Sequence, residues 1–252
     1  MKVSIITVTF NGAKTIAKCI DSVRSQNYSD IEHIIVDGGS TDGTVSILKN
    51  SKLRFISERD CGIYDAMNKG IELATGDIIG ILNSDDYLFS NEVISKIVEL
   101  IKISGVDLVH GKVNIINSDG SCLTTQGADQ QLKQLIYHMK IAHPSVYLRR
   151  EVYSLYGKFS VGYRIAADYD FLLRIIGRVK VAFLNEPLVS MLDGGVSSRQ
   201  VRRSLREAMA VRIVHGMPPA TAYINYLIER IRYRASILSR NLKTRLSSSG
   251  SK

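Results

Sequence analysis

The sequence has few cysteines and prolines, no tryptophan and no long apolar run. Its three cysteines, Cys19, Cys61 and Cys122, are odd in number, far apart and without a Cys-x-x-Cys pair, which argues against a disulfide framework and a zinc ribbon. Four prolines argue against a long proline-rich linker. No apolar stretch has the length of a membrane-spanning helix, and the first residues lack a signal-peptide pattern, so we expect a cytoplasmic protein.

Positive charge is concentrated in the last part of the chain. Residues 199–252 contain 12 lysines and arginines against two acidic residues, Glu207 and Glu229, a local charge of +10, whereas residues 1–198 contain 21 basic and 22 acidic residues. We therefore expect a nearly neutral domain, 1–198, followed by a basic helical extension, 199–252. Such an extension favours an anionic partner, while a solvated basic helix is the simpler alternative.

The extension contains a predicted amphipathic helix that begins near Pro218 and Pro219. Its apolar stripe consists of Ile224, Leu227, Ile228, Ile231, Ala235, Leu238 and Leu242, and the flanking basic residues are Arg230, Arg232, Arg234, Arg240 and Lys243. This pattern favours contact of residues 218–246 with an anionic membrane surface, which would make the protein peripheral at the inner membrane. Packing on the chain's own domain or on a second subunit is the alternative. We expect no nucleic-acid partner.

Strand-like and helix-like segments alternate through residues 1–90. The predicted strands are 3–10, 33–36, 53–57 and 77–82, and the predicted helices are 16–23, 41–49 and 63–74. The strands are nearly continuous apolar runs, which is typical of strands buried on both faces. We predict an α/β fold with a mostly parallel central sheet and helices on both faces. Ligands of such sheets bind beyond the carboxyl ends of the strands.

The second half of the chain has a less regular pattern. The predicted helices are 94–101, 130–139 and 168–176, and the predicted strands are 108–116, 122–125, 143–149, 179–184 and 188–192. The run Asn117-Ser118-Asp119-Gly120 predicts a turn between the first two of these strands.

Acidic residues follow several of the predicted strands. Asp85 and Asp86 lie in the run Asn83-Ser84-Asp85-Asp86, directly after the fourth strand. Adjacent carboxylates repel each other unless a cation or solvent compensates the charge, and Mg²⁺ or Mn²⁺ prefers such oxygen ligands. The alternative is that Ser84 or Asp85 caps a helix.

The glycine-rich run from Asp37 to Gly43 follows the second strand. It lacks both the Gly-x-Gly-x-x-Gly spacing and the Gly-Lys-Ser/Thr ending of phosphate loops, which disfavours a Rossmann dehydrogenase or a kinase. An aspartate at a strand end can instead accept hydrogen bonds from a base or ribose. A turn leading into the next helix explains residues 40–43 equally well.

Four motifs together resemble the inverting glycosyltransferase family two. They are Val3-Ser-Ile-Ile-Thr-Val-Thr-Phe-Asn-Gly12, Ile35-Val-Asp-Gly-Gly-Ser-Thr-Asp-Gly-Thr44, Gly62-Ile-Tyr-Asp-Ala-Met-Asn-Lys-Gly70 and Gly76-Asp-Ile-Ile-Gly-Ile-Leu-Asn-Ser-Asp-Asp86. Their order and spacing match across residues 1–90, and the match continues more loosely to about residue 195. The resemblance implies a GT-A fold, which is Rossmann-like, a nucleotide-sugar donor and a divalent cation, Mg²⁺ or Mn²⁺.

The resemblance also implies roles for individual residues around the donor. Thr9 and Asn11 would lie beside the nucleotide and Asp37 would hold its base. Asp60 and Asp65 would line the donor pocket. Asp85 would be the principal metal ligand, and Asp86 would touch the sugar or the metal shell. Family members usually have Asp-x-Asp in this motif, whereas this chain has Asn83 at the first position.

The expected general base is Asp168, in the segment Ala166-Ala167-Asp168-Tyr169-Asp170 ahead of an apolar helix. Many family members have Glu-Asp there, and Ala167 replaces the glutamate. An N-cap is the alternative role for Asp168. His143, followed by Pro144, and Arg164 are expected on the acceptor side, where the alternatives are a structural histidine and a surface charge.

The resemblance thus implies an inverting transfer of a sugar from a nucleoside-diphosphate sugar to a hydroxyl group. The resemblance and the basic extension favour a lipid-linked glycan acceptor in bacterial cell-surface polysaccharide synthesis. One alternative is a nucleotidyl or phosphosugar transferase that uses the same acidic edge. Another is a catalytically inactive module of the same fold that binds a membrane surface.

Overall fold

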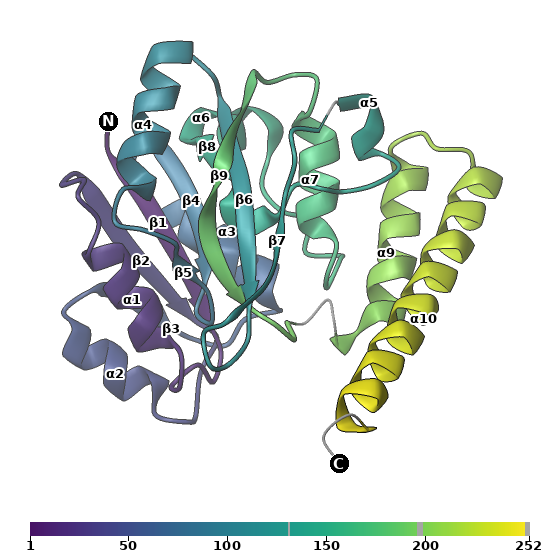
Figure 1. Ribbon diagram of the computed structural model, residues 1–252. Coiled ribbons are helices and arrows are strands. Elements are labelled where there is room, and N and C mark those ends of the chain that lie inside the picture. The colour runs from purple at the N-terminus through teal and green to yellow at the C-terminus, as the bar shows by residue number, and fades with distance from the viewer. Residues whose placement is uncertain (131, 196–198, 250–252) are drawn as a thin grey trace.

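The N-terminal half of the chain forms the parallel part of the sheet. In the computed structural model (Figure 1), the described residues are 1–130, 132–195 and 199–249, and the described side chains exclude those of 132, 133 and 236–249. Strands β1 (Val3–Thr9), β2 (Ile31–Asp37), β3 (Arg54–Ser57) and β4 (Ile78–Asn83) lie parallel in the order β3-β2-β1-β4. Helices α1 (Ile16–Arg24), α2 (Thr44–Ser51) and α3 (Ile63–Leu73) connect them, as predicted.

The second half extends this sheet with strands of both directions. Beyond β4 follow β8 (Tyr147–Arg149), β6 (Leu108–Ile116), β9 (Val181–Leu192) and β5 (Tyr87–Leu88), while β7 (Cys122–Gln126) pairs with β6. The β4/β8, β8/β6, β6/β7 and β5/β9 pairs are antiparallel and the β6/β9 pair is parallel. The α/β prediction is confirmed, with a mixed sheet that is parallel throughout its first four strands.

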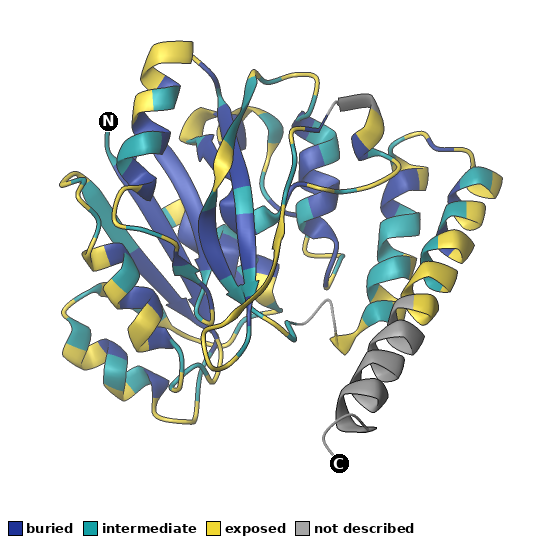
Figure 2. Cartoon of the chain, in the orientation of Figure 1, coloured by how far each residue is buried: buried dark blue, intermediate teal, exposed yellow. Residues whose placement is uncertain are grey.

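Helices cover both faces of the sheet. Buried residues concentrate in the strands and on the helices that cover them (Figure 2). They form a core on each face of the sheet, because β1 and β4 direct alternate residues to opposite sides. One core joins the sheet to α1 and to α4 (Val93–Ser104). The other joins it to α3, α6 (Arg150–Tyr156) and α7 (Ala167–Ile175). A smaller cluster lies under α1 and α2.

Four predicted elements differ from the observed ones. Residues 143–149 were predicted as one strand, but His143–Ser145 form a short 3₁₀ turn and β8 begins at Tyr147. Pro144 has no N–H to donate to a strand ladder, which explains the change. The two strands predicted at 179–184 and 188–192 are one strand, β9, which passes Pro187 with a shift in register. The helix predicted at 130–139 is the short α5 (Leu132–Leu135).

The C-terminal extension forms two helices, α9 (Val201–Val214) and α10 (Pro219–Ser249), which lie side by side (Figure 1). The helix predicted to begin near Pro219 is confirmed. Helix α9 lies in the segment predicted as helical without bounds of its own, and α6 was not predicted. Val211 of α9 is fully buried in the same core as α7. The extension and the sheet therefore share a core, and the division at residue 198 stays a prediction.

The described apolar stripe of α10 is only partly covered by the rest of the chain. Ala222 and Tyr226 are the buried apolar residues of its described part. Ile224, Leu227, Ile228 and Ile231 are 56%, 37%, 40% and 66% exposed. Ile224 and Ile231 are thus mostly exposed, whereas Leu227 and Ile228 are partly covered, and packing of the stripe on the chain's own domain stays an alternative. Leu238, Arg240, Leu242 and Lys243 lie outside the described side chains.

Glu32 joins the starts of three parallel segments. Its carboxylate lies 2.9 Å from Lys2 Nζ, accepts a hydrogen bond from the Ser4 hydroxyl, and accepts the backbone N–H groups of Thr75 at 2.6 Å and Gly76 at 3.1 Å. Partial burial raises the pKa of Glu32, but the hydrogen bonds from Ser4, Lys2 and Thr75 outweigh burial and lower this pKa to about 2.

A pKa below the ordinary value of 4.5 means that the Glu32 carboxylate stabilises the folded state above that value, and that this stabilisation is lost as pH falls toward 2. We predict that Glu32→Gln lowers the free energy of unfolding by about 1–2 kcal/mol at pH 7, a figure reduced for solvent screening. The difference between variant and wild type should shrink between pH 4.5 and pH 2. Denaturant unfolding across this range measures it, with exposed Glu99→Gln as the control. An offset that is independent of pH would contradict the assignment.

Candidate active site

The carboxyl ends of four parallel strands place the predicted donor residues along one edge of the sheet. Thr9 of β1 lies opposite Asp37 of β2, Val8 lies opposite Asn83 of β4, and Asp37 lies opposite Ser57 of β3. The loops that leave these strand ends contain Asn11, the glycines 38 and 39, Asp60, Asp85 and Asp86. The parallel register therefore brings chain segments far apart in sequence to one rim, as predicted from the fold class.

Asp37 is fully buried and organises the loop that follows it. Its Oδ2 accepts the backbone N–H groups of Gly39 at 3.2 Å and Ser40 at 3.0 Å and the Ser57 hydroxyl at 2.7 Å. The Ser40 hydroxyl donates to Oδ1. Both oxygens thus stabilise the turn into α2, and a contact between Asp37 and the nucleotide base stays a prediction.

The loop after β1 packs against the loops after β2 and β4. Asn11 has a left-handed backbone (φ 54°), and its Oδ1 accepts the Thr41 N–H at 2.9 Å. A side chain on Gly12 would begin 2.4 Å from Thr9 Oγ1 and 2.9 Å from Ser84 Oγ, so only glycine permits this close approach. Thr9 Oγ1 is buried and has no hydrogen-bond partner among the described residues.

The loop after β4 presents one exposed and one buried carboxylate. Asp85 is exposed, whereas Asp86 is 3% exposed and accepts a hydrogen bond from Asn83 Nδ2 at 3.0 Å. Burial, and to a smaller extent the neighbouring Asp85 charge, raises the pKa of Asp86 to about 8. Asn83 Oδ1 is buried without a partner among the described residues. An orphaned amide oxygen beside two carboxylates fits a hard cation.

The protein supplies only part of a cation's coordination sphere. Among the described residues, no three histidines, cysteines, aspartates or glutamates gather in a way that could hold a metal. A cation at Asp85 would therefore need further oxygen ligands from substrate or water. Mg²⁺ commonly binds in this way, through one or two carboxylates and substrate phosphates.

Asp60 and Asp65 hold the turn ahead of α3. Asp60 Oδ1 accepts the Gly62 N–H at 2.8 Å, and Asp65 Oδ2 accepts the Cys61 N–H at 3.0 Å. A side chain on Gly38 would begin 2.5 Å from Asp60 Oδ2, so the glycine leaves room for this carboxylate at the rim. The structure thus brings Asp60 beside the loop after β2, where a donor contact stays a prediction.

Asp168 lies in the first turn of α7 and is half-buried. Ala166 occupies the N-cap position, so the alternative of Asp168 as an N-cap is wrong. Asp168 Oδ1 accepts the Tyr64 hydroxyl at 3.0 Å and the Tyr169 N–H at 2.9 Å. Burial and the Asp168 charge raise the pKa of Tyr64 well above its ordinary value, so that its hydroxyl remains a donor.

His143 lies near Asp168, and Arg164 lies against the turn ahead of α3. The His143 ring packs edge-on against Phe159, with ring centres 5.4 Å apart. Burial lowers the pKa of His143, and the nearby Asp168 charge only partly opposes this, so the imidazole is neutral at neutral pH. Arg164 Nη1 donates to Cys61 O at 2.8 Å, which joins the segment before α7 to the turn after Asp60.

Sequence reasoning missed three contributors to this site. Tyr64 was part of a quoted motif but received no role, although it binds Asp168. Gly38 matters for the space that it leaves. Phe10 is 66% exposed at the end of β1, next to Gly38. An aromatic residue that breaks the polar pattern directly after a buried strand was the available signal for Phe10.

Comparison with known proteins identifies the family. Residues 4–155 match the model of the glycosyl transferase family 2. A Mycobacterium bovis protein named as a PGL/p-HBAD biosynthesis glycosyltransferase is 35% identical over 178 residues, which cover 68% of each chain. A glycosyltransferase of Nostoc, described as uncharacterized, is 29% identical over 265 residues, covering 97% of this chain and 81% of the relative.

Solved structures share the fold at lower identity. Residues 1–349 of S. aureus TarS in complex with UDP-GlcNAc superpose with a TM-score of 0.70 at 18% identity, covering 88% of this chain and 69% of that one. This chain spans 41% of the longer TarS chain. A mannosyltransferase from Pyrobaculum calidifontis in complex with GDP-Man and Mn²⁺ superposes with a TM-score of 0.64 at 19% identity, covering 89% and 68%. The sheet is therefore that of a GT-A fold, and the chain belongs to the glycosyl transferase family 2.

Proposed function

We propose that this glycosyltransferase transfers a sugar, with inversion, from a nucleoside-diphosphate sugar to a hydroxyl group of a glycan. The observation that carries the proposal is the placement of Asp168. Tyr64 fixes one of its oxygens, and Arg164, in the segment before it, reaches the loop of Asp60 at the donor rim. A carboxylate oriented beside a donor site is the arrangement that a single displacement at the anomeric carbon requires.

The donor side rests on the loops after β1, β2 and β3. Phe10 offers an exposed ring to a nucleobase, and Asp60 offers a carboxylate oxygen in the space left by Gly38. Thr9 and Asn11 lie in the same rim. The structural relatives that contain UDP, UDP-GlcNAc or GDP-Man support a nucleotide-sugar donor for this fold.

Asp85, with Asn83 Oδ1 beside it, would hold Mg²⁺ or Mn²⁺, and Asp86 would lie in the shell around the ion or against the sugar. The Mn²⁺ in the Pyrobaculum mannosyltransferase supports this choice. A bound cation would neutralise charge on the departing nucleoside diphosphate. The Asn83 amide N–H donates a hydrogen bond to Asp86. The amide oxygen of Asn83, Oδ1, has no partner among the described residues and would serve as a neutral ligand.

Asp168 acts as the general base. Its Oδ1 is held by Tyr64 and Tyr169, and no described residue donates a hydrogen bond to Oδ2, which we assign as the atom that takes the acceptor proton. The acceptor oxygen then attacks the anomeric carbon from the face opposite the leaving group. His143 is neutral and can accept or donate one hydrogen bond on the acceptor side, near Asp168.

The acceptor is a lipid-linked glycan, presented at a membrane surface on which α10 lies. The exposed apolar residues of α10 and the +10 charge of residues 199–252 support this part of the proposal. Within the described residues, no helix is both long enough and apolar enough to span a bilayer. Contact with lipid would therefore be made along the surface of the helix.

For the base, we predict that Asp168→Asn lowers kcat at least 100-fold while the Kd for UDP or GDP with Mn²⁺ stays within about twofold of wild type. An amide cannot take the proton, but it can still accept the Tyr64 hydrogen bond. Turnover is measured as release of nucleoside diphosphate from a panel of UDP- and GDP-sugars, and affinity by calorimetry. Wild-type turnover in this variant rejects Asp168 as the base.

For the cation, we predict that Asp85→Asn weakens binding of UDP or GDP at least tenfold in the presence of Mn²⁺. With a chelator, the variant and the wild type should bind the nucleotide equally, because the lost interaction depends on the ion. Calorimetry in both conditions gives the comparison. Equal affinities with Mn²⁺ present count against Asp85 as a ligand.

For the membrane, we predict that the full chain floats with vesicles that contain anionic lipid and not with neutral vesicles. Replacing two exposed side chains of α10, Ile224→Ser with Ile231→Ser, should reduce the bound fraction at least fivefold. Ile103→Ser is the control, since Ile103 is 78% exposed on α4. Equal flotation of the double variant and the wild type would contradict contact of α10 with the membrane.

A further inference from the structure

Helix α9 supplies an acidic side chain to the segment that leads into α7. Glu207 Oε2 accepts three consecutive backbone N–H groups, from Arg164 at 3.0 Å, Ile165 at 2.8 Å and Ala166 at 3.2 Å. Its Oε1 accepts the Arg203 Nε–H at 2.9 Å, and the Glu207 side chain is 15% exposed. Three donors on one carboxylate oxygen fix the path of this segment, because bonds to a charged acceptor are the strong ones.

Helix α9 and His215, the residue directly after it, also contact the two residues that follow Asp168. Arg212 Nε lies 3.3 Å from the Tyr169 hydroxyl, and His215 Nε2 lies 2.9 Å from Asp170 Oδ1. Glu207, Arg212 and His215 thus bind residues on both sides of Asp168 in the sequence: residues 164–166 before it, and residues 169 and 170 after it. The extension is thereby attached to the part of α7 that contains the proposed base.

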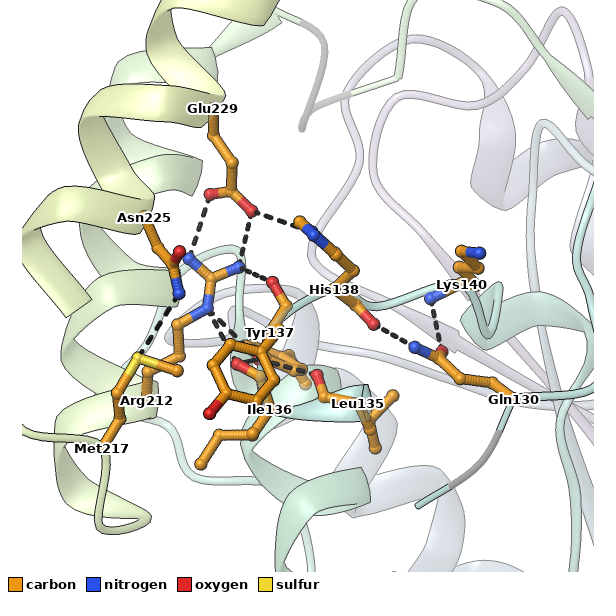
Figure 3. A network of polar contacts seen from close by, with 11 residues as sticks. Gln130, Leu135, Ile136, Tyr137, His138, Lys140, Arg212, Met217, Asn225 and Glu229 are labelled. Atoms are coloured by element: carbon orange, nitrogen blue, oxygen red, sulfur yellow. Dashed lines mark hydrogen bonds and ion pairs between the residues drawn. The ribbon is translucent and has the colours of Figure 1, made fainter. Parts of the chain in front are cut away.

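Arg212 is itself held in place, which makes this attachment rigid (Figure 3). It is 2% exposed and forms a bidentate ion pair with Glu229 of α10, from Nη1 to Oε2 at 3.0 Å and from Nη2 to Oε1 at 2.6 Å. It also donates to the carbonyl oxygens of Ile136 at 3.1 Å and Tyr137 at 3.0 Å. Glu207 and Glu229, the two acidic residues of the extension, thus both bind within the interface between the helices and the domain.

The segment bound by Glu207 is coupled to the carboxylate of Asp168 through Tyr64. The Tyr64 hydroxyl lies 2.5 Å from Ile165 O and 3.0 Å from Asp168 Oδ1, so these two acceptors share its single proton. Any shift of residues 164–166 therefore moves one of the two groups that orient this hydroxyl. The same shift would move Arg164, whose side chain reaches the loop of Asp60.

We infer that Glu207 is a positioning residue, through which helix α9 sets the orientation of Asp168 relative to the donor rim. The inference rests on the proposed function, in which Asp168 is the base. It makes the extension a part of the catalytic apparatus, in addition to any contact that α10 makes with lipid. Glu207 reaches no substrate itself and acts only through residues 164–166 and Tyr64.

The test compares three variants of the full chain. Glu207→Ala removes the acceptor, Glu207→Gln keeps an acceptor oxygen without the charge, and Arg203→Ala removes the partner of Oε1 but leaves the three backbone bonds. Amide hydrogen exchange of residues 164–170 is measured without substrate, together with Tm, the Kd for UDP or GDP with Mn²⁺, and kcat and KM with the donor panel at a temperature well below each Tm.

The expected result for Glu207→Ala is exchange at 164–168 at least tenfold faster, kcat at least tenfold lower and a nucleotide Kd within about twofold of wild type. Glu207→Gln should recover at least half of the wild-type kcat, and Arg203→Ala should match wild type in kcat and in exchange. A merely stabilising role would lower Tm and leave kcat at saturating donor unchanged.

Three results overturn the inference, and the first two are unchanged exchange at 164–168 in Glu207→Ala and faster exchange there with wild-type kcat. An equal loss of kcat in Glu207→Ala and Arg203→Ala also overturns it, because it would assign the effect to the ion pair. If the wild-type chain binds no nucleoside diphosphate and releases none, the proposed function fails instead. The exchange data then still decide whether Glu207 holds the segment before α7.

Discussion

A single kind of interaction builds the rim of this protein: a carboxylate that accepts backbone N–H groups from a loop. Asp37 binds the turn into α2, Asp60 and Asp65 bind the turn into α3, and Glu207 binds the segment before α7. Loops at the ends of parallel strands have N–H groups without ladder partners, and buried groups of this kind must be paired. The acidic residues that pair them fix the loops, and the remaining carboxylates are then available for chemistry.

The acidic residues of the rim fall into two classes, according to whether their carboxylate oxygens are occupied by hydrogen bonds. Asp37 and Glu207 are saturated by hydrogen bonds and hold the architecture. Asp85 is exposed, and Asp168 has one oxygen that no described residue binds. Asn83 Oδ1 and Thr9 Oγ1, at the same edge, are buried and have no hydrogen-bond partner among the described residues. Such groups cost stability, and their concentration at a strand edge is the signature of a site that is completed by a ligand.

The parallel half of the fold could be predicted from the sequence because its signals are local. Strands β1, β2 and β4 consist mostly of apolar and β-branched residues, and each ends in a turn with polar residues. Parallel pairing alone then places Thr9, Asp37 and Asn83 at one edge. The second half was predicted less well, since Pro144 ends strand pairing and β9 continues past Pro187, and both depend on contacts with other strands.

The roles of individual acidic residues could not be predicted from their position, because the roles depend on partners far away in the sequence. Asp37 binds Ser57, and Glu207 binds residues more than 40 positions before it. The sequence did contain a signal for Glu207, as one of two acids among 12 basic residues in 199–252. An isolated acid in a basic segment indicates a specific partner, which here is a row of backbone N–H groups.

The most direct test is a crystal structure of the full chain with Mn²⁺ and a nucleoside diphosphate, with the ion located by its anomalous scattering. The account predicts the ion on Asp85, the base between Phe10 and Asp60, and Asp168 Oδ2 facing the open space beyond the terminal phosphate. An ion bound away from Asp85, or a nucleotide bound away from the ends of β1, β2 and β4, would contradict it.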